Sequence, residues 1–219
     1  MTKNINVKND KITFFHMFYM FLFGCLFGWI VEFIWSLGKR HMFYNHSALI
    51  LGPFDIVYGL AALMLTLILN KFKKCNNFII FIVSFVAGTV LEYAASFGME
   101  KMLGMVAWNY SSKFMHINGR VCLVYSLFWG ILGIIWVRFA MPKVLKIIDK
   151  IDLKAGKKFM YIMLCFLTVD AILTFAAVDR AKKYEEGVPA NNIVDKCFDK
   201  YFGVDYLNNM YNNRWKQID

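Results

Sequence analysis

Long runs of apolar residues, separated by short polar stretches, make up most of this chain. A helix needs roughly 18 or more apolar residues to cross the ~30 Å of hydrocarbon in a bilayer. Five runs approach or exceed that length, at residues 14–37, 49–69, 78–97, 121–141 and 159–178. The pattern predicts an all-α fold, a polytopic membrane helix bundle with about five transmembrane helices.

Polar stretches at the two ends delimit this membrane domain. Residues 1–11 form a short polar lead, and residues 12–180 form the predicted five-span transmembrane domain. Residues 181–219 form a tail that is interrupted at Gly187-Val188-Pro189. Apolar residues recur at helical spacing from Ile193 to Phe202, so we expect short helices there, including an amphipathic one.

Two parts of the membrane domain resemble one another. Gly28 precedes Glu32 by four residues inside one apolar run, and Gly88 precedes Glu92 in the same way inside another. After each glutamate the chain passes a polar loop and enters a second apolar run, which contains Tyr58-Gly59 in one case and Trp129-Gly130 in the other. We interpret this as a duplicated helix pair, with repeat 1 at about 14–70 and repeat 2 at about 78–141.

The second apolar run opens with Gly52-Pro53, which is unusual for a spanning helix. Proline is tolerated in the first turn of a helix, but deeper in the helix it frees a carbonyl that needs another partner. Either the helix begins at Pro53, with residues 47–52 as extended chain in the membrane, or it is broken there. Both arrangements place unpaired backbone groups near Glu32 and Asp55, as is typical of a cavity wall.

The net charge of +10 would suit nucleic-acid binding, but the distribution of the charge argues for a membrane protein. Most lysines outside the apolar runs belong to one side of the predicted topology: Lys3, Lys8, Lys11, Lys71, Lys73, Lys74, Lys143, Lys146, Lys150, Lys154, Lys157 and Lys158. The positive-inside rule then places the N-terminus in the cytoplasm and, after five crossings, the C-terminal tail outside. Membrane lipids are the expected partners, and nucleic acid is not.

Acidic residues within the apolar runs mark the candidate site. Glu32, Glu92 and Asp170 lie inside predicted spans, and Asp55 lies near a helix start. An acid at the centre of a spanning helix costs about 2.5–3.5 kcal/mol on insertion scales, so such residues usually face a functional interior. Parallel directions of the first and third helices would put Glu32 and Glu92 at similar depth around a shared centre. Two carboxylates so close would not both ionise readily, which would permit proton exchange.

We therefore predict a set of substrate-binding residues and a set of structural ones. The substrate-binding candidates are Glu32, Glu92, Asp170, Asp55, Arg120, Tyr58, Asn118 and Trp108. The structural candidates are Gly28, Gly52, Pro53, Gly59, Gly88, Gly119, Trp129 and Gly130. Arg120 would supply a counter-charge or an anion contact. Alternatively, Glu32 or Glu92 pairs with Arg120 and hydrogen-bonds the irregular backbone at Gly52-Pro53, which would make the acids structural.

Motifs for metal, cofactor or nucleotide chemistry are not found in the sequence. The histidines His16, His41, His46 and His116 have no HxxxH or HExxH spacing, and the five cysteines form no CxxC. Neither a GxSxG nor a P-loop occurs. We therefore expect no metal and no cofactor, and we name no catalytic residue.

The motifs together resemble a family of bacterial multi-pass membrane proteins, the putative ABC-transporter type IV family. The resemblance rests on Gly28-x-x-x-Glu32, Gly52-Pro53, Tyr58-Gly59, Trp108-Asn109-Tyr110-Ser111, Asn118-Gly119-Arg120-x-Cys122-Leu123, Trp129-Gly130 and Pro189-Ala190-Asn191. It covers most of the chain. It implies a permease-like role, and a permease of this kind would need a separate ATPase chain as partner.

Three functions fit the pattern. The first is a transporter or permease component, in which Glu32, Glu92 and Asp170 line a polar cavity open to the outside and bind a cation, a proton or a small polar solute. The second is an integral membrane enzyme acting on a lipid or lipid-linked group at the outer leaflet, with paired carboxylates as general acid and base. The third is a structural subunit for another membrane protein, contacted through the tail.

Overall fold

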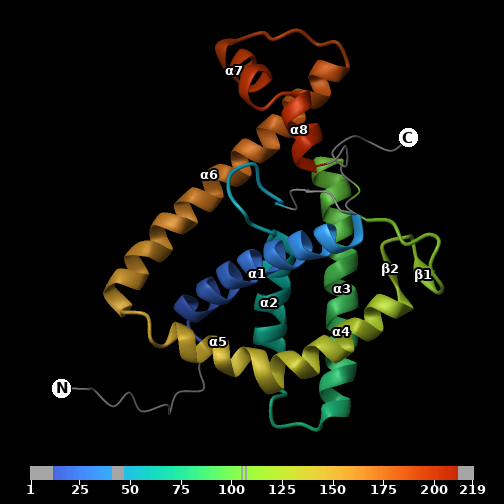
Figure 1. Ribbon diagram of the computed structural model, residues 1–219, viewed down its shortest axis with the longest axis vertical. Coiled ribbons are helices and arrows are strands. Elements are labelled where there is room, and N and C mark those ends of the chain that lie inside the picture. The colour runs from blue at the N-terminus through green and yellow to red at the C-terminus, as the bar shows by residue number, and fades with distance from the viewer. Residues whose placement is uncertain (1–11, 41–46, 105, 107, 212–219) are drawn as a thin grey trace.

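The fold is mostly helical, as Figure 1 shows for this computed structural model. The structure describes residues 12–40, 47–104, 106 and 108–211. The helices are α1 (Phe14–Arg40), α2 (Ile56–Leu69), α3 (Asn77–Leu103), α4 (Leu123–Ile135), the π-helix η1 (Trp136–Ala140), α5 (Met141–Ile148), α6 (Leu153–Glu185), α7 (Ile193–Tyr201) and α8 (Val204–Tyr211). A short antiparallel hairpin, β1 (His116–Ile117) and β2 (Val121–Cys122), precedes α4.

Four helical stretches within the described residues are long and apolar enough to cross a membrane. They are Phe14–Gly38, Asn77–Met102, Leu123–Ile148 and Leu153–Glu185. The third runs through α4, η1 and α5, which follow one another without a break. The predicted helical fold is thus confirmed in outline, with four candidate spans in place of five.

The second predicted run, at residues 49–69, forms a helix too short to be one of these four spans. The apolar run begins at residue 49, whereas α2 begins at Ile56 and has 14 residues, three residues after the start at Pro53 that was one of our two alternatives. The reason lies in the local sequence: Gly52 adopts a left-handed φ of 82°, and Pro53 follows it. Asp55 then caps the helix, because its side chain accepts hydrogen bonds from the backbone N–H groups of Val57 and Tyr58.

The non-helical segment 47–55 hydrogen-bonds to α6 through its backbone. The N–H of Ile50 donates to Thr174 Oγ1 at 3.0 Å, and the N–H of Leu51 donates to Asp170 Oδ1 at 3.0 Å. Backbone groups that lack water must find partners within the protein, since each unsatisfied group costs several kcal/mol in lipid. The α6 side chains therefore replace the hydrogen bonds that a helix would have made.

Helix α8 donates hydrogen bonds to backbone carbonyls of the same segment. The Tyr206 hydroxyl donates to the Ile50 carbonyl at 2.9 Å, and the Tyr211 hydroxyl donates to the Ala48 carbonyl at 3.2 Å. Leu207, which is fully buried, packs in one apolar cluster with Ala177 and Val178 of α6. The predicted tail helices are thus α7 and α8, and α8 is fixed to the membrane domain.

The helices pack as two close pairs, α1 with α2 and α3 with α4, through small residues. A Cβ added at Gly24 of α1 would meet the Ala62 side chain and the Gly59 backbone of α2. A Cβ at Gly133 of α4 would overlap Ser84 of α3. Small residues at these positions let the backbones approach closely, which matters in lipid because apolar area alone does not drive helices together.

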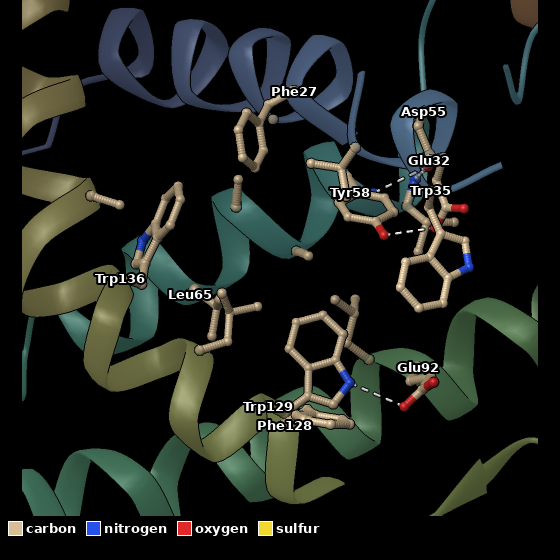
Figure 2. Close-up of a pocket in the computed structure, with 18 of the residues that line it drawn as sticks. Phe27, Glu32, Trp35, Asp55, Tyr58, Leu65, Glu92, Phe128, Trp129 and Trp136 are labelled. Atoms are coloured by element: carbon tan, nitrogen blue, oxygen red, sulfur yellow. Dashed lines mark hydrogen bonds between the residues drawn. The ribbon is translucent and has the colours of Figure 1, made fainter. Parts of the chain in front are cut away.

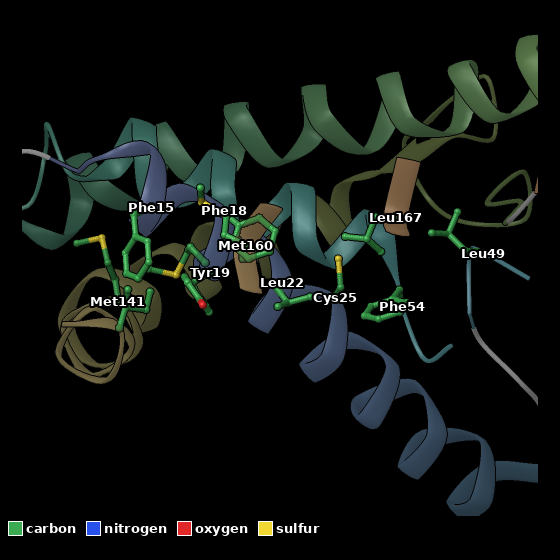
Figure 3. Close-up of a cluster of buried hydrophobic side chains, with 13 residues drawn as sticks. Phe15, Phe18, Tyr19, Leu22, Cys25, Leu49, Phe54, Met141, Met160 and Leu167 are labelled. Carbon is green, nitrogen blue, oxygen red and sulfur yellow. The ribbon is translucent and has the colours of Figure 1, made fainter. Parts of the chain in front are cut away.

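Helices α5 and α6 join the first half of α1 in the main apolar core, which Figure 3 shows. Phe15, Phe18 and Tyr19 of α1 contact this cluster, together with Ile148 of α5 and Met160 of α6. The cluster attaches α5, which continues from α4 of the second helix pair, to the beginning of α1 in the first pair. The space left between the two pairs, farther along α1, becomes a cavity.

We expect Gly88→Ala to destabilise the protein and Gly98→Ala, on the same helix, to be tolerated. A Cβ at Gly88 would overlap the Trp129 side chain, whereas nothing lies within 4 Å of one at Gly98. Overpacking of this kind costs about 1–3 kcal/mol. Thermal unfolding of the detergent-purified protein measures the difference, and equal melting temperatures for the two variants would contradict the packing described.

Candidate ligand cavity

A cavity of about 1960 Å³ lies between the two helix pairs. Its walls come from α1, α2, α3, α4, η1 and α5, with contributions from residues 108 and 110 and from Tyr211 of α8. Figure 2 shows its interior, with side chains from both pairs directed inward. The volume exceeds the roughly 300–1,000 Å³ of most small-molecule sites. Most lining residues are apolar or aromatic, so the polar cavity that we expected is polar only at a few positions.

Glu32 of α1 is one of the polar groups, and it is held by the adjacent helix of its own pair. The Tyr58 hydroxyl of α2 donates to Glu32 Oε1 at 2.8 Å. Tyr58 can lie against α1 because residue 28, one turn before Glu32, is glycine: a Cβ there would overlap the tyrosine side chain. The predicted structural role of Gly28 thus has a specific cause.

Glu92 of α3 is held in a similar way in the other pair. The Trp129 indole N–H of α4 donates to Glu92 Oε2 at 3.0 Å, and the Tyr110 hydroxyl donates to Oε1 at 3.0 Å. Gly88, one turn before Glu92, leaves room for the Trp129 ring. Both oxygens of Glu92 therefore accept hydrogen bonds, an arrangement that suits an ionised carboxylate.

Glu32 and Glu92 project from opposite walls toward the same end of the cavity in Figure 2. Leu65 and Trp136 lie toward the other end in the same view. The hydrogen bonds described for each carboxylate stay within its own helix pair. Direct proton sharing between the two glutamates stays a prediction.

Tyr110 lines the cavity, although we predicted it only as part of the Trp108-Asn109-Tyr110-Ser111 motif and not as a site residue. Its ring stacks on Tyr125 of α4 at 4.6 Å between centroids. Burial, together with the neighbouring Glu92 carboxylate, raises the pKa of the Tyr110 phenol above its ordinary value. The phenol therefore stays protonated and remains a donor to Glu92.

Trp108 and Asp55, two of the predicted substrate-binding residues, also line the cavity. The indole N–H of Trp108 donates to the Arg120 carbonyl at 2.8 Å, which ties the loop to the turn between β1 and β2. Asp55 caps α2 beside Tyr58. Five of the eight predicted substrate-binding residues therefore share one cavity: Glu32, Asp55, Tyr58, Glu92 and Trp108.

Arg120 and Asn118 are not among the described residues that line the cavity. Arg120 forms an ion pair with Glu100 at 2.6 Å, and its guanidinium lies over the rings of Tyr93 and Phe97. The Asn118 amide donates to the Tyr93 hydroxyl at 2.9 Å. The ion pair of Arg120 is thus with Glu100, in contrast to the pairing with Glu32 or Glu92 that we considered.

Asp170 lies outside the described lining as well, in the core between α6 and segment 47–55. Its side chain is fully buried, Oδ1 accepts from Leu51, and Oδ2 has no hydrogen-bond partner. From this position Asp170 holds segment 47–55, which borders the cavity, through the hydrogen bond to Leu51. A direct contact of Asp170 with substrate stays a prediction.

No group of three or more His, Cys, Asp or Glu side chains in the described part of the chain is arranged to hold a metal ion. His41 and His46 fall outside the described residues. What the cavity offers is a set of carboxylates, phenol and indole donors, and aromatic ring faces.

Comparison with known proteins identifies the family of this chain. A comparison with curated proteins found no match, and neither did a comparison with solved structures. A family model described as Putative ABC-transporter type IV matches residues 19–175, which span α1 to the middle of α6 and nearly all of the cavity lining. This chain therefore belongs to the Putative ABC-transporter type IV family of membrane proteins.

Proposed function

We propose that this protein is a membrane-embedded transporter component that binds its solute in the cavity between the two helix pairs. One observation carries the proposal: two carboxylates from different pairs, the partly buried Glu32 and the buried Glu92, border one large cavity within apolar helices. Carboxylates are costly in such surroundings, and they usually mark a pathway or a site. Family membership supports the same role.

The two helix pairs are, in this proposal, diverged copies of one unit. Matching contacts support this: a Cβ at Gly59 would meet Phe21, and a Cβ at Gly130 would meet Phe81. Phe21 precedes Gly28 by seven residues, just as Phe81 precedes Gly88. Repeats related by an axis along the membrane normal allow one unit to rock against the other around a central site. Alternating access would then open the cavity to either side.

The energy source proposed is a separate ATPase chain. No P-loop occurs in this sequence, and the family description names an ABC transporter. Exposed apolar side chains on the spanning helices, such as Phe78 and Ile172, provide the surface for lipids or for another membrane subunit.

A lipid-directed enzyme is the second candidate, and the size of the cavity favours it. A volume of about 1960 Å³ would admit an acyl chain beside a head group. Glu32 and Glu92 would then act as general base and acid at the reacting group. Chemical change of a bound lipid, followed by mass spectrometry, separates this function from transport.

Binding is the first test of the transporter proposal. We expect at least one compound in a panel of organic cations, amino acids, nucleosides and lipids to raise the melting temperature of the purified protein, since a ligand at 100 times its Kd stabilises by about 2.7 kcal/mol. The Glu32→Gln/Glu92→Gln variant should lose this rise. Glu186→Gln, which removes an exposed carboxylate far along the chain, should keep it.

An absence of any ligand effect, with a double variant that merely melts lower than the parent, would assign both glutamates to a structural role. The transporter proposal would then be wrong. A rise that persists undiminished in the double variant would place binding outside this cavity and would also contradict it.

The proposed orientation places the N-terminus in the cytoplasm and the tail outside, which requires the shorter helix α2 to make a fifth crossing beside the four long spans. Native cysteines make this testable, because Cys75 lies between α2 and α3 and Cys197 is exposed on α7. Two variants would each keep one of these cysteines and replace the others by serine. A membrane-impermeant maleimide should label Cys197 in intact cells and label Cys75 only after permeabilisation, and the reverse result would invert the topology.

A further inference from the structure

Exposed lysines gather where the chain passes from one candidate membrane span to the next. The apolar run at residues 121–141 ends just before them, and the run at residues 159–178 begins just after them. They lie on α5, on the short turn 149–152 and on the first two turns of α6, which Figure 1 shows joined at one side of the molecule. The six form what we call the basic surface: Lys143, Lys146, Lys150, Lys154, Lys157 and Lys158. Because spanning helices leave the hydrocarbon where their apolar runs end, the basic surface belongs at the level of the lipid head groups.

Helix α5 has a buried face and a basic face on opposite sides. Its buried face packs in the main apolar core with α1, through residues at steps of three and four: Met141, Val144, Leu145 and Ile148. Two residues further along, the chain has turned by about 200° around the helix axis. The exposed side repeats the same spacing at these positions: Lys143, Lys146, Ile147 and Lys150. The core therefore fixes which way the lysines of α5 point.

The two acidic residues of this stretch have partners of their own. Asp149 Oδ1 lies 2.9 Å from the His16 Nε2 of α1. Asp152 caps α6, because its side chain accepts a hydrogen bond from the Ala155 N–H at 2.8 Å. Residues 141–158 thus carry six lysines against two aspartates. This excess of positive charge complements an anionic group.

The loop between α2 and α3 adds further positive charge beside η1, which leads into α5. Arg138 of η1 donates to the Lys73 carbonyl at 2.8 Å and to the Cys75 carbonyl at 2.6 Å. These hydrogen bonds hold the loop against the helix that continues as α5. The loop carries Lys71 and Lys74, both exposed.

Apolar side chains are exposed among the lysines. Ile147 lies on the basic face of α5, and Leu153 and Phe159 lie on the first turns of α6. Ile147 also lines the cavity, near Val144. A free anion would gain nothing from these side chains, whereas the acyl chains of a lipid would remove them from water. The combination of lysines with exposed apolar side chains therefore favours an amphiphile as the ligand.

We propose that the basic surface binds anionic phospholipids. The head group lies on Lys143, Lys146 and Lys150, and an acyl chain lies against Ile147. Clusters of four to eight basic residues next to a spanning helix bind anionic head groups in this way. The inference goes beyond the proposed function, because it concerns the lipid at the membrane surface and not the solute of the cavity.

Two phospholipids with identical acyl chains give a direct test. Phosphatidylglycerol and phosphatidylcholine both contain a phosphate, but only phosphatidylglycerol has a net negative charge. Each is added to the purified full-length protein in neutral detergent, and bound lipids are counted by native mass spectrometry. Inorganic phosphate, which has the charge without acyl chains, is tested as a competitor.

We expect phosphatidylglycerol to bind at least fivefold more tightly than phosphatidylcholine at low ionic strength. The preference should decrease as salt is added, since salt screens exposed charges. Lys143→Gln/Lys146→Gln/Lys150→Gln should reduce it below twofold. The matched control is Lys113→Gln/Lys196→Gln/Lys200→Gln, which removes the same charge at exposed positions outside the basic surface and should keep the preference.

Equal affinity for the two phospholipids in the parent protein would overturn the inference, and this comparison needs no variant. A preference that survives in the α5 variant, or that falls as far in the control, would also contradict it, because net charge and not the basic surface would then select the lipid. Displacement of phosphatidylglycerol by an equal concentration of inorganic phosphate would assign the lysines to a soluble anion instead. Glu32→Gln/Glu92→Gln should keep the lipid preference, so that failure of the transporter proposal and failure of this inference give different results.

Discussion

A carboxylate inside an apolar helix must accept hydrogen bonds from the protein, and the rest of this structure depends on how that need is met. Glu32 and Glu92 each receive a donor from the neighbouring helix, Tyr58 in one pair and Trp129 in the other. A large aromatic residue can reach the glutamate only if the facing helix offers a glycine one turn earlier. The contact of the aromatic residue with the glycine therefore both packs the two helices closely and holds the glutamate in the cavity wall.

A similar constraint governs segment 47–55, whose backbone is not helical. Asp170 and Thr174 on α6 accept its N–H groups, and two tyrosines of α8 donate to its carbonyls. Since residues 47, 48 and 55 of the segment also line the cavity, the tail and α6 together determine the shape of that wall. A helix far along the chain is thus coupled to the candidate site through backbone hydrogen bonds.

The electrostatics of the molecule separate its surface from its interior. Lysines gather in the loops and at helix ends, whereas the described cavity lining carries acids and no basic side chain. Arg120, the basic residue closest in sequence to the site motifs, is instead neutralised by Glu100 and shielded by two rings. This segregation places the basic side chains of the described residues outside the described lining of the cavity.

Much of the fold followed from the sequence alone, because the length and hydropathy of a run determine whether it can cross a membrane as a helix. The glycine and glutamate spacing likewise indicated where Glu32 and Glu92 would matter, and Gly52-Pro53 indicated that α2 would be irregular at its start. Only the tertiary structure decided the partner of each polar group: Glu100 for Arg120, Leu51 for Asp170, and Tyr110 for Glu92. Periodicity describes which face of a helix is apolar, but it contains no information about which distant side chain will reach a buried charge, since that choice depends on how the helices cross.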